Sequence, residues 1–354
     1  MARKRVAVAL SGGVDSSTAA FLLQEAGYEV IGVVMRLWPE EETAPADQRR
    51  SGYSTRSIYD AEQVCLTLGV PFHTLNLEDE FKQHVIDYFC REYTQGRTPN
   101  PCIACNQHIK FGFLLEQALS LGADYLATGH YVRIEYFNDA YHLLKGVDPD
   151  KDQSYMLYTL GQDKLNRLLS PLGNYLKSEV RELARQKGLP AADRPSSQDI
   201  CFPSTGCATF LNQRSTTTQG EIVNQQGDVL GKHKGTPFYT IGQRHGLGLA
   251  TAERLYVTNI EPDTNRITVG SEEELCSSGL TASRVNWVSG KPPSEPITVN
   301  AKIRYRSPEV PATLYPKPDS VDIEFHQPQR AITPGQAVVF YQDSEVLGGG
   351  TIGN

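Results

Sequence analysis

The strongest constraint on the fold is an alternation of apolar runs with helical patterns between residues 5 and 131. An apolar run at 5–10 is followed by a segment with the spacing of an amphipathic helix, and 30–35 is a second apolar run. The order then repeats, with helices expected at 57–69, 78–96 and 106–121 and strands at 71–77 and 125–131. Strands separated by helices predict an α/β fold, a doubly wound parallel sheet with helices on both faces.

The chain of 354 residues is too long for one ordinary core and favours two or three domains. From residue 219 onward, short strands and turns replace the α/β pattern, which predicts a small C-terminal β-barrel. We expect a sheet domain at 1–162, to which a loop at 190–207 returns. A small central α+β domain is expected at 163–189 and 208–276, and the barrel at 277–354. Residues 39–56 are polar and aperiodic, typical of a loop.

The composition limits the cellular locations and the classes of binding partner that fit the protein. Seven cysteines at irregular spacing argue against a secreted disulfide framework and favour a reducing, cytoplasmic location. No run approaches the ~18 apolar residues of a membrane helix. A net charge of -7 argues against indiscriminate nucleic-acid binding, although it leaves room for a local basic face.

The motif SGGVDS at 11–16 lies between the first strand and the first helix, where ligands bind in open parallel sheets. Its glycines allow close backbone approach, and its hydroxyls and the helix N-terminus favour a phosphate. The motif is neither a Walker loop nor GxGxxG. It resembles the PP-loop of ATP pyrophosphatases, which implies Mg²⁺ placed with the help of Asp15. The resemblance implies ATP binding by Ala9, Leu10, Ser11, Gly12, Gly13, Val14, Asp15, Ser16, Met35 and Gly129.

Two cysteines stand three residues apart in NPCIACN, residues 100–106. Cys105 directly precedes the helix expected at 106–121, and a helix N-terminus favours a thiolate, so Cys105 is the better nucleophile of the pair. Zinc held by both cysteines with histidines, or a thioredoxin-like redox pair, remains an alternative. Cys201 lies in a later loop, and we expect that loop to fold over the SGGVDS turn.

The order of several blocks is similar to that in the tRNA-specific 2-thiouridylase family. The blocks are SGGVDSS, GRTPNPCIACNQHIKFG, ATGHY, KDQSYMLY, SSQDICF, FYTIGQRHGLG and AKIRYR. The resemblance implies adenylation of O2 of the wobble uridine of tRNA, and sulfur delivery from a persulfide on Cys201, with Cys105 as nucleophile. A Cys105–Cys201 disulfide would remain. A variant mechanism has Cys201 release hydrosulfide. No structural zinc is expected.

The same resemblance implies the contacts with RNA. Target-base contacts fall on Asn100, Pro101 and Cys102, and many relatives carry Asp where Cys102 stands, so we expect Cys102 to be a spectator in the pocket. Contacts with the tRNA anticodon stem-loop fall on His130, Lys151, Asp152, Gln153, Arg304, Tyr305 and Gln336. The basic segment 163–188 could add phosphate contacts. A cysteine-desulfurase relay would supply the persulfide, and we expect a monomer.

Two other functions fit parts of the sequence. Another PP-loop ligase or synthetase would transfer AMP without needing Cys105 or Cys201. A non-enzymatic, zinc-bearing tRNA-binding module would bind zinc and leave ATP unused.

Overall fold

The structure is a computed structural model that describes residues 3–38, 55–193, 210–211, 217–251 and 253–353. Most of the loop expected at 39–56 and most of the loop at 190–207, including Cys201, lie outside the described residues. Among the helices that are described, none is long and apolar enough to cross a lipid bilayer.

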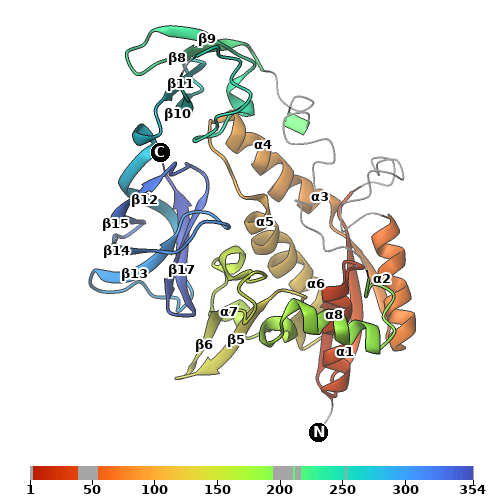
Figure 1. The fold of residues 1–354 in the computed structure, drawn as a ribbon. Coiled ribbons are helices and arrows are strands. Elements are labelled where there is room, and N and C mark those ends of the chain that lie inside the picture. The colour runs from red at the N-terminus through yellow and green to blue at the C-terminus, as the bar shows by residue number, and fades with distance from the viewer. Residues whose placement is uncertain (1–2, 39–54, 194–209, 212–216, 252, 354) are drawn as a thin grey trace.

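The N-terminal part, which begins at the red end of the chain in Figure 1, contains a five-stranded sheet. Its strand order is β3-β2-β1-β4-β7, and every pairing is parallel. Its strands are β1 (Arg5–Ala9), β2 (Glu29–Arg36), β3 (Phe72–Asn76), β4 (Tyr125–Ala127) and β7 (Leu168–Leu169). The predicted parallel sheet is therefore confirmed. The order reverses direction at β1, between β2 and β4, and such a switch point is where open α/β sheets bind ligands.

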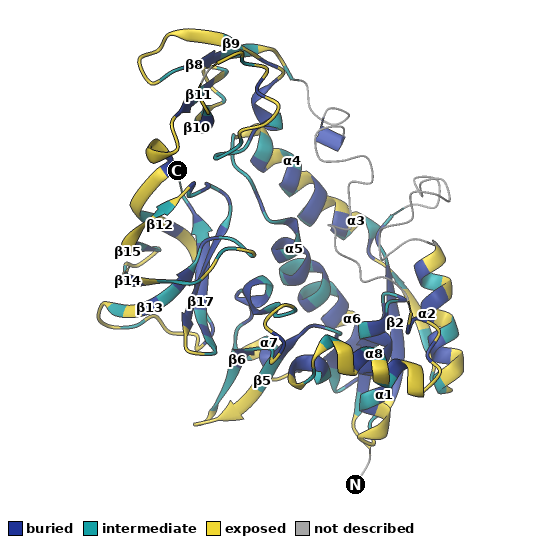
Figure 2. Ribbon diagram, in the orientation of Figure 1, coloured by how far each residue is buried: buried dark blue, intermediate teal, exposed yellow. Residues whose placement is uncertain are grey.

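Helices pack on this sheet through apolar faces. They are α1 (Val14–Glu25), α2 (Thr55–Leu68), the run of α3 (Glu78–Phe81), η3 (Lys82–Ile86) and α4 (Asp87–Thr94), and α8 (Lys177–Gln186). Two separate clusters of buried apolar side chains, one including Ile31 and Val33 and the other Val30 and Val34, contain alternate residues of β2. Both faces of the strand are thus covered, as Figure 2 shows by the dark blue of the sheet.

One helical segment runs without a break from Pro101 to Ser120 beside the sheet. It consists of α5 (Pro101–Ala104), the π-helical stretch η4 (Cys105–Phe113) and α6 (Leu114–Ser120). The helix therefore begins at Pro101, and the prediction that it begins at 106 is wrong. The sequence carries the signal for the earlier start, because asparagine favours the N-cap position and proline the first helical position.

Residues 163–189 pack with the first sheet rather than with the central domain that we expect for them. Helix α7 (Gln162–Leu165) leads into β7, which pairs with β4. Helix α8 packs against α1, and the apolar residues Val180 and Ala184 on its inner face are buried. A strand of only two residues carries too weak a pattern to reveal this placement from sequence.

The remainder of the chain forms two β-structures. The central sheet has the order β10-β11-β8-β9, with strands at Tyr256–Glu261, Arg266–Gly270, Gly220–Val223 and Val229–His233. The C-terminal barrel has the order β12-β15-β14-β13-β16-β17, and pairing of β12 with β17 closes it. Its strands are β12 (Cys276–Trp287), β13 (Ile297–Lys302), β14 (Val310–Pro316), β15 (Ser320–Arg330), β16 (Ala337–Gln342) and β17 (Glu345–Ile352).

A hairpin from the N-terminal part joins the barrel to the sheet domain. Strands β5 (Val132–Phe137) and β6 (Ala140–Lys145) extend the barrel sheet through a pairing of β6 with β17. The hairpin directly follows β4 and Gly129. The pairing thereby keeps the barrel beside the N-terminal part of the chain (Figure 1).

Candidate functional site

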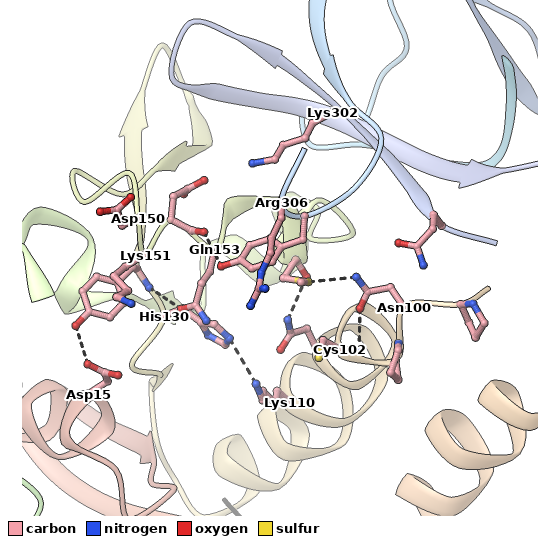
Figure 3. Close-up of a pocket in the computed structure, with 18 of the residues that line it drawn as sticks. Asp15, Asn100, Cys102, Lys110, His130, Asp150, Lys151, Gln153, Lys302 and Arg306 are labelled. Carbon is pink, nitrogen blue, oxygen red and sulfur yellow. Dashed lines mark hydrogen bonds between the residues drawn. The ribbon is translucent and has the colours of Figure 1, made fainter. Parts of the chain in front are cut away.

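A pocket of about 830 Å³ lies where the sheet domain, the start of α5 and the barrel meet. Figure 3 shows Cys102 and Lys110 along the helical segment, Asp15 at the turn after β1, and Lys302 and Arg306 on the barrel side. Most predicted contacts with the base and the RNA line it, namely Asn100, Pro101, Cys102, His130, Lys151, Asp152, Gln153, Tyr305 and Gln336.

The turn between β1 and α1 is closely packed at its glycine and leads into a helix start without a side-chain cap. Gly12 has φ +70°, and a Cβ there would lie 2.8 Å from Ser57 O, so a larger residue cannot take its place without displacing α2. A Cβ on Gly129 would lie 2.8 Å from Ser16 N, at the first turn of α1. The N-cap residue of α1, Gly13, provides no side-chain hydrogen bond to the helix. The backbone amides at this helix start can therefore donate to an anion.

Asp15 is the acidic group of this turn, and it is already paired. Its Oδ1 accepts hydrogen bonds from the Tyr131 hydroxyl at 2.6 Å and from Lys177 Nζ at 2.5 Å. Burial lowers the pKa of Lys177, while the charge of Asp15 acts in the opposite direction. The two residues place one carboxylate and one ammonium at the start of α1, a set of charged groups that would suit a triphosphate with its cation.

The Asp15 carboxylate is also a suitable ligand for the Mg²⁺ ion that is expected from the sequence. No cluster of three or more His, Cys, Asp or Glu residues that could hold a metal occurs in the described part of the chain. Mg²⁺ is commonly bound through one or two carboxylates together with substrate phosphates, and Asp15 can supply such a carboxylate. Met35, expected beside the adenine, lies near the end of β2 and is buried.

The start of the helical segment exposes Cys102 to the pocket and buries Cys105. Asn100 Oδ1 accepts hydrogen bonds from the backbone amides of Cys102 at 3.1 Å and Ile103 at 3.4 Å, which caps the helix. Cys102 lies in the first helical turn, and Cys105 lies in the second turn, where it is 7% exposed and packs in a core cluster with Ile109. The helix-terminus effect on a thiolate therefore applies to Cys102, and our prediction that it favours Cys105 is wrong.

His130 forms part of the pocket wall as a neutral side chain. Its Nδ1 lies 2.7 Å from Thr128 Oγ1, and its Nε2 lies 3.5 Å from Lys110 Nζ. Because an ammonium group can only donate, Nε2 is the acceptor and Nδ1 carries the proton. Burial, with a smaller contribution from the charge of Lys110, holds the pKa of His130 well below its usual value.

The barrel side of the pocket carries an aromatic residue and two cations. The Tyr305 hydroxyl donates to Asp152 O at 3.1 Å, which connects the barrel to the loop before η5 (Ser154–Leu157). Lys302 and Arg306 line the pocket. Arg304, predicted as a tRNA contact, is absent from the described lining, and its guanidinium donates to Ala331 O and to Thr333 Oγ1.

Residues of the barrel hydrogen-bond to the segment that precedes Asn100 and anchor it. Gln336 Nε2 donates to Thr98 O at 2.7 Å, and Thr98 N donates to Pro334 O at 2.8 Å. A Cβ on Gly335, which has φ +88°, would lie 3.0 Å from Thr98 N. Gln336 therefore serves as a support for the pocket wall as well as a part of its lining.

Several pocket residues escape sequence reasoning. Lys110, Tyr131, Lys177, Lys302 and Arg306 all line the pocket. Lys177 belongs to the basic segment that we consider for phosphate contacts, but its sequence position alone does not single it out from its neighbours. The β13 strand ends at Lys302, so strand alternation cannot predict the directions of Arg304 and Arg306.

Comparison with known proteins covers the chain almost from end to end. Three family models match consecutive parts: a tRNA methyl transferase HUP domain at 4–205, a tRNA methyl transferase PRC-barrel domain at 208–271 and an aminomethyltransferase beta-barrel domain at 277–352. The tRNA-specific 2-thiouridylase MnmA of Carboxydothermus hydrogenoformans is 50% identical over 356 residues, with 99% of this chain and 98% of that protein covered. The protein of the same name from Pelotomaculum thermopropionicum is 47% identical, with coverage of 99% and 98%. The one from Moorella thermoacetica is 50% identical, with coverage of 98% and 98%.

Proposed function

The chain belongs to the tRNA-specific 2-thiouridylase family, and we propose on this premise that it converts the wobble uridine of tRNA to 2-thiouridine in a reaction that uses ATP. The observation that carries this proposal is the shared pocket. One cavity joins the phosphate-binding turn at Asp15, the helix start at Cys102 and the cations of the barrel, Lys302 and Arg306. Nucleotide, thiol and RNA backbone can therefore meet in one place.

The residues of the turn after β1 would bind the triphosphate. The amides at the start of α1 and the ammonium of Lys177 would neutralise phosphate charge, and Asp15 would hold Mg²⁺. Bound Mg²⁺ would supply further charge neutralisation at the phosphates. Both present hydrogen bonds of Asp15 are accepted by Oδ1, so Oδ2 would be the atom that holds Mg²⁺, and Lys177 would use another of its N–H groups to donate to a phosphate oxygen.

The sulfur chemistry proceeds in three proposed steps. Transfer of AMP to uracil O2 releases pyrophosphate and makes that oxygen a good leaving group. The terminal sulfur of a Cys201 persulfide attacks C2, and AMP departs with the oxygen. The Cys105 thiolate then attacks Cys201 Sγ, which breaks the sulfur–sulfur bond and releases 2-thiouridine. A Cys105–Cys201 disulfide remains and needs an external thiol for reduction.

The role of Cys105 as nucleophile is assigned from family membership. Because Cys105 is buried and Cys102 lies at the helix start, Cys102 is the second thiol to be tested as the nucleophile. The two residues are three apart on the helical segment, so their side chains lie on neighbouring positions of its surface. Both thiols must therefore be tested separately.

The RNA would enter from the side of the barrel. Lys151, Lys302 and Arg306 line the pocket, and these cations suit the phosphates of an anticodon loop. The wobble base must leave its stack to reach Cys102. The ring of Tyr305 lines the same pocket and would be available to stack on the displaced base. We place the protein in the cytoplasm as a monomer, with a persulfide-carrying protein from a cysteine-desulfurase relay as donor.

The decisive test is a thiolation assay. The full chain is incubated with ATP, Mg²⁺, unmodified tRNA and a persulfide donor, and nucleosides are analysed by mass spectrometry. We expect 2-thiouridine from the wild type, none above background from Cys105→Ser or Cys201→Ser, and substantial product from Cys102→Ala.

Other outcomes would contradict separate parts of the proposal. AMP formation without any 2-thiouridine would indicate a different PP-loop ligase or synthetase. Stoichiometric zinc without ATP turnover would indicate a binding module. Full activity of Cys105→Ser together with an inactive Cys102→Ala would move the nucleophile to the helix start.

A further inference from the structure

Asn106 is a buried amide in the wall of the pocket. It is 3% exposed and lies within the π-helical stretch Cys105–Phe113, four residues after Cys102. Both Cys102 and Asn106 line the pocket. Side chains four residues apart share a helix face, and π-helical stretches are frequent at functional sites.

The orientation of this amide is fixed by one hydrogen bond. Asn106 Nδ2 donates to Met156 O at 3.1 Å. A carbonyl oxygen can only accept, so the amide cannot be turned around without losing this bond. The opposite atom, Asn106 Oδ1, must therefore stay an acceptor.

Asn106 Oδ1 has no hydrogen-bond partner among the residues that the structure describes. A buried acceptor without a donor destabilises a folded protein, and native structures contain few such atoms. The oxygen is closed off from solvent in this structure, so a donor reaches it only after neighbouring side chains move. A donor carried by the substrate would satisfy it at the moment of binding.

We propose that Asn106 Oδ1 accepts a hydrogen bond from N3–H of the target base and thereby selects uracil over cytosine. This inference rests on the proposed function, which brings a uridine into this pocket. The ring of uracil has two carbonyl oxygens and one N–H donor on its pairing edge, and that donor is N3–H. Enzymes that take a base out of its stack commonly read this edge.

Cytosine would be rejected by the same atom. Its N3 is an acceptor, so its lone pair would face the fixed oxygen of Asn106 and both groups would remain without a donor. Leaving a buried polar group unpaired is an effective way to discriminate between similar substrates. Asn106 is on this account a specificity-determining residue that takes no part in the sulfur transfer.

A binding experiment without ATP or sulfur donor tests this. Fluorescence anisotropy gives the Kd of anticodon stem-loop RNAs that differ only in a wobble uridine or cytidine, for the wild type, Asn106→Leu and Asn106→Ala. The matched control is Asn286→Leu, because Asn286 Nδ2 likewise donates to backbone oxygens of this chain segment, Tyr158 O and Leu160 O, and Asn286 is absent from the described pocket lining.

We expect the wild type to prefer uridine RNA, and the preference to fall roughly 10- to 100-fold in both Asn106 variants. Asn286→Leu should keep the wild-type preference. An unchanged preference in a folded Asn106 variant, or an equal loss in Asn286→Leu, would overturn the proposal. The thiolation assay on the same wild-type preparation separates the two claims: absence of 2-thiouridine there would overturn the proposed function itself.

Discussion

Lys177 and Asp15 illustrate how single residues prepare the nucleotide site. The Lys177 side chain is 11% exposed, and its ammonium pairs with Asp15 and lies over the ring of Tyr131, 5.8 Å from the ring centroid. Burying a charge is unfavourable unless it is paired, so Asp15 holds Lys177 in position until phosphate arrives. Sequence reasoning identifies Asp15 through its motif, but it cannot identify Lys177, because the two residues are 162 positions apart.

Replacing Lys177 tests this role. Lys177→Met should raise the KM for ATP roughly 10- to 100-fold, since a hydrogen bond to a charged group contributes about 1.5–3 kcal/mol. Steady-state pyrophosphate release at varied ATP measures the effect. Lys187→Met is the control and should keep the wild-type KM, because Lys187 lies at the opposite end of α8, where its ammonium lies over the Phe21 ring. An unchanged KM in Lys177→Met would remove this residue from the ATP site.

At the scale of elements, the start of the helical segment decides which thiol faces the pocket. Asn100 caps the helix and Pro101 occupies its first position, so Cys102 falls in the first turn and Cys105 in the second. Cys102 thus lies at the helix start, where the sequence pattern places Cys105, and Cys105 lies one turn further into the helix. The apolar periodicity of the sequence begins at residue 106, so it does not show that the helix begins five residues earlier, at Pro101.

Loss of the cap should loosen this helix start. Asn100→Ala should cost about 1 kcal/mol, and a cost of that size corresponds to roughly fivefold faster amide hydrogen exchange in a peptide that contains Cys102 and Ile103. Asn100→Asp keeps an oxygen acceptor at the cap and should exchange like the wild type. Equal exchange in Asn100→Ala and the wild type would show that the cap does not stabilise the segment.

The parallel sheet, its helices and the barrel follow from sequence periodicity, because apolar spacing reports which face of an element is buried. The PP-loop and the residues at 100–102 and 151–153 follow from their motifs, and Asp15 of the loop does meet the other residues in the pocket. The placement of 163–189 in the first sheet, the direction of Arg304 and the pocket role of Arg306 depend on tertiary packing. No local pattern encodes them.

At the scale of the whole molecule, an acidic chain gathers several cations in one pocket, which is the proposed RNA site. The net charge is -7, yet Lys110, Lys151, Lys177, Lys302 and Arg306 line the same pocket. The hairpin that pairs β6 with β17 and the bond from Gln336 to Thr98 keep the barrel beside the sheet domain. The proposed RNA-binding surface therefore depends on contributions from both parts of the chain.

The salt dependence of tRNA binding tests this arrangement. Replacing both Lys302 and Arg306 by Ala should reduce the slope of log K against log salt by about 1–2, since each phosphate contact contributes close to one unit. Arg304→Ala, whose guanidinium is bonded within the barrel, is the control and should leave the slope unchanged. The reverse pattern would return Arg304 to the contact surface and remove Lys302 and Arg306 from it.

The most direct measurement of the central claim is a single turnover followed by peptide mass spectrometry. Wild-type protein with persulfide on Cys201 is mixed with ATP, Mg²⁺ and tRNA without reductant, and 2-thiouridine and disulfide-linked peptides are both quantified. The account predicts a peptide pair joined through Cys105 and Cys201 that forms in equal amount with 2-thiouridine. Formation of 2-thiouridine with the disulfide on Cys102, or with no disulfide at all, would contradict it.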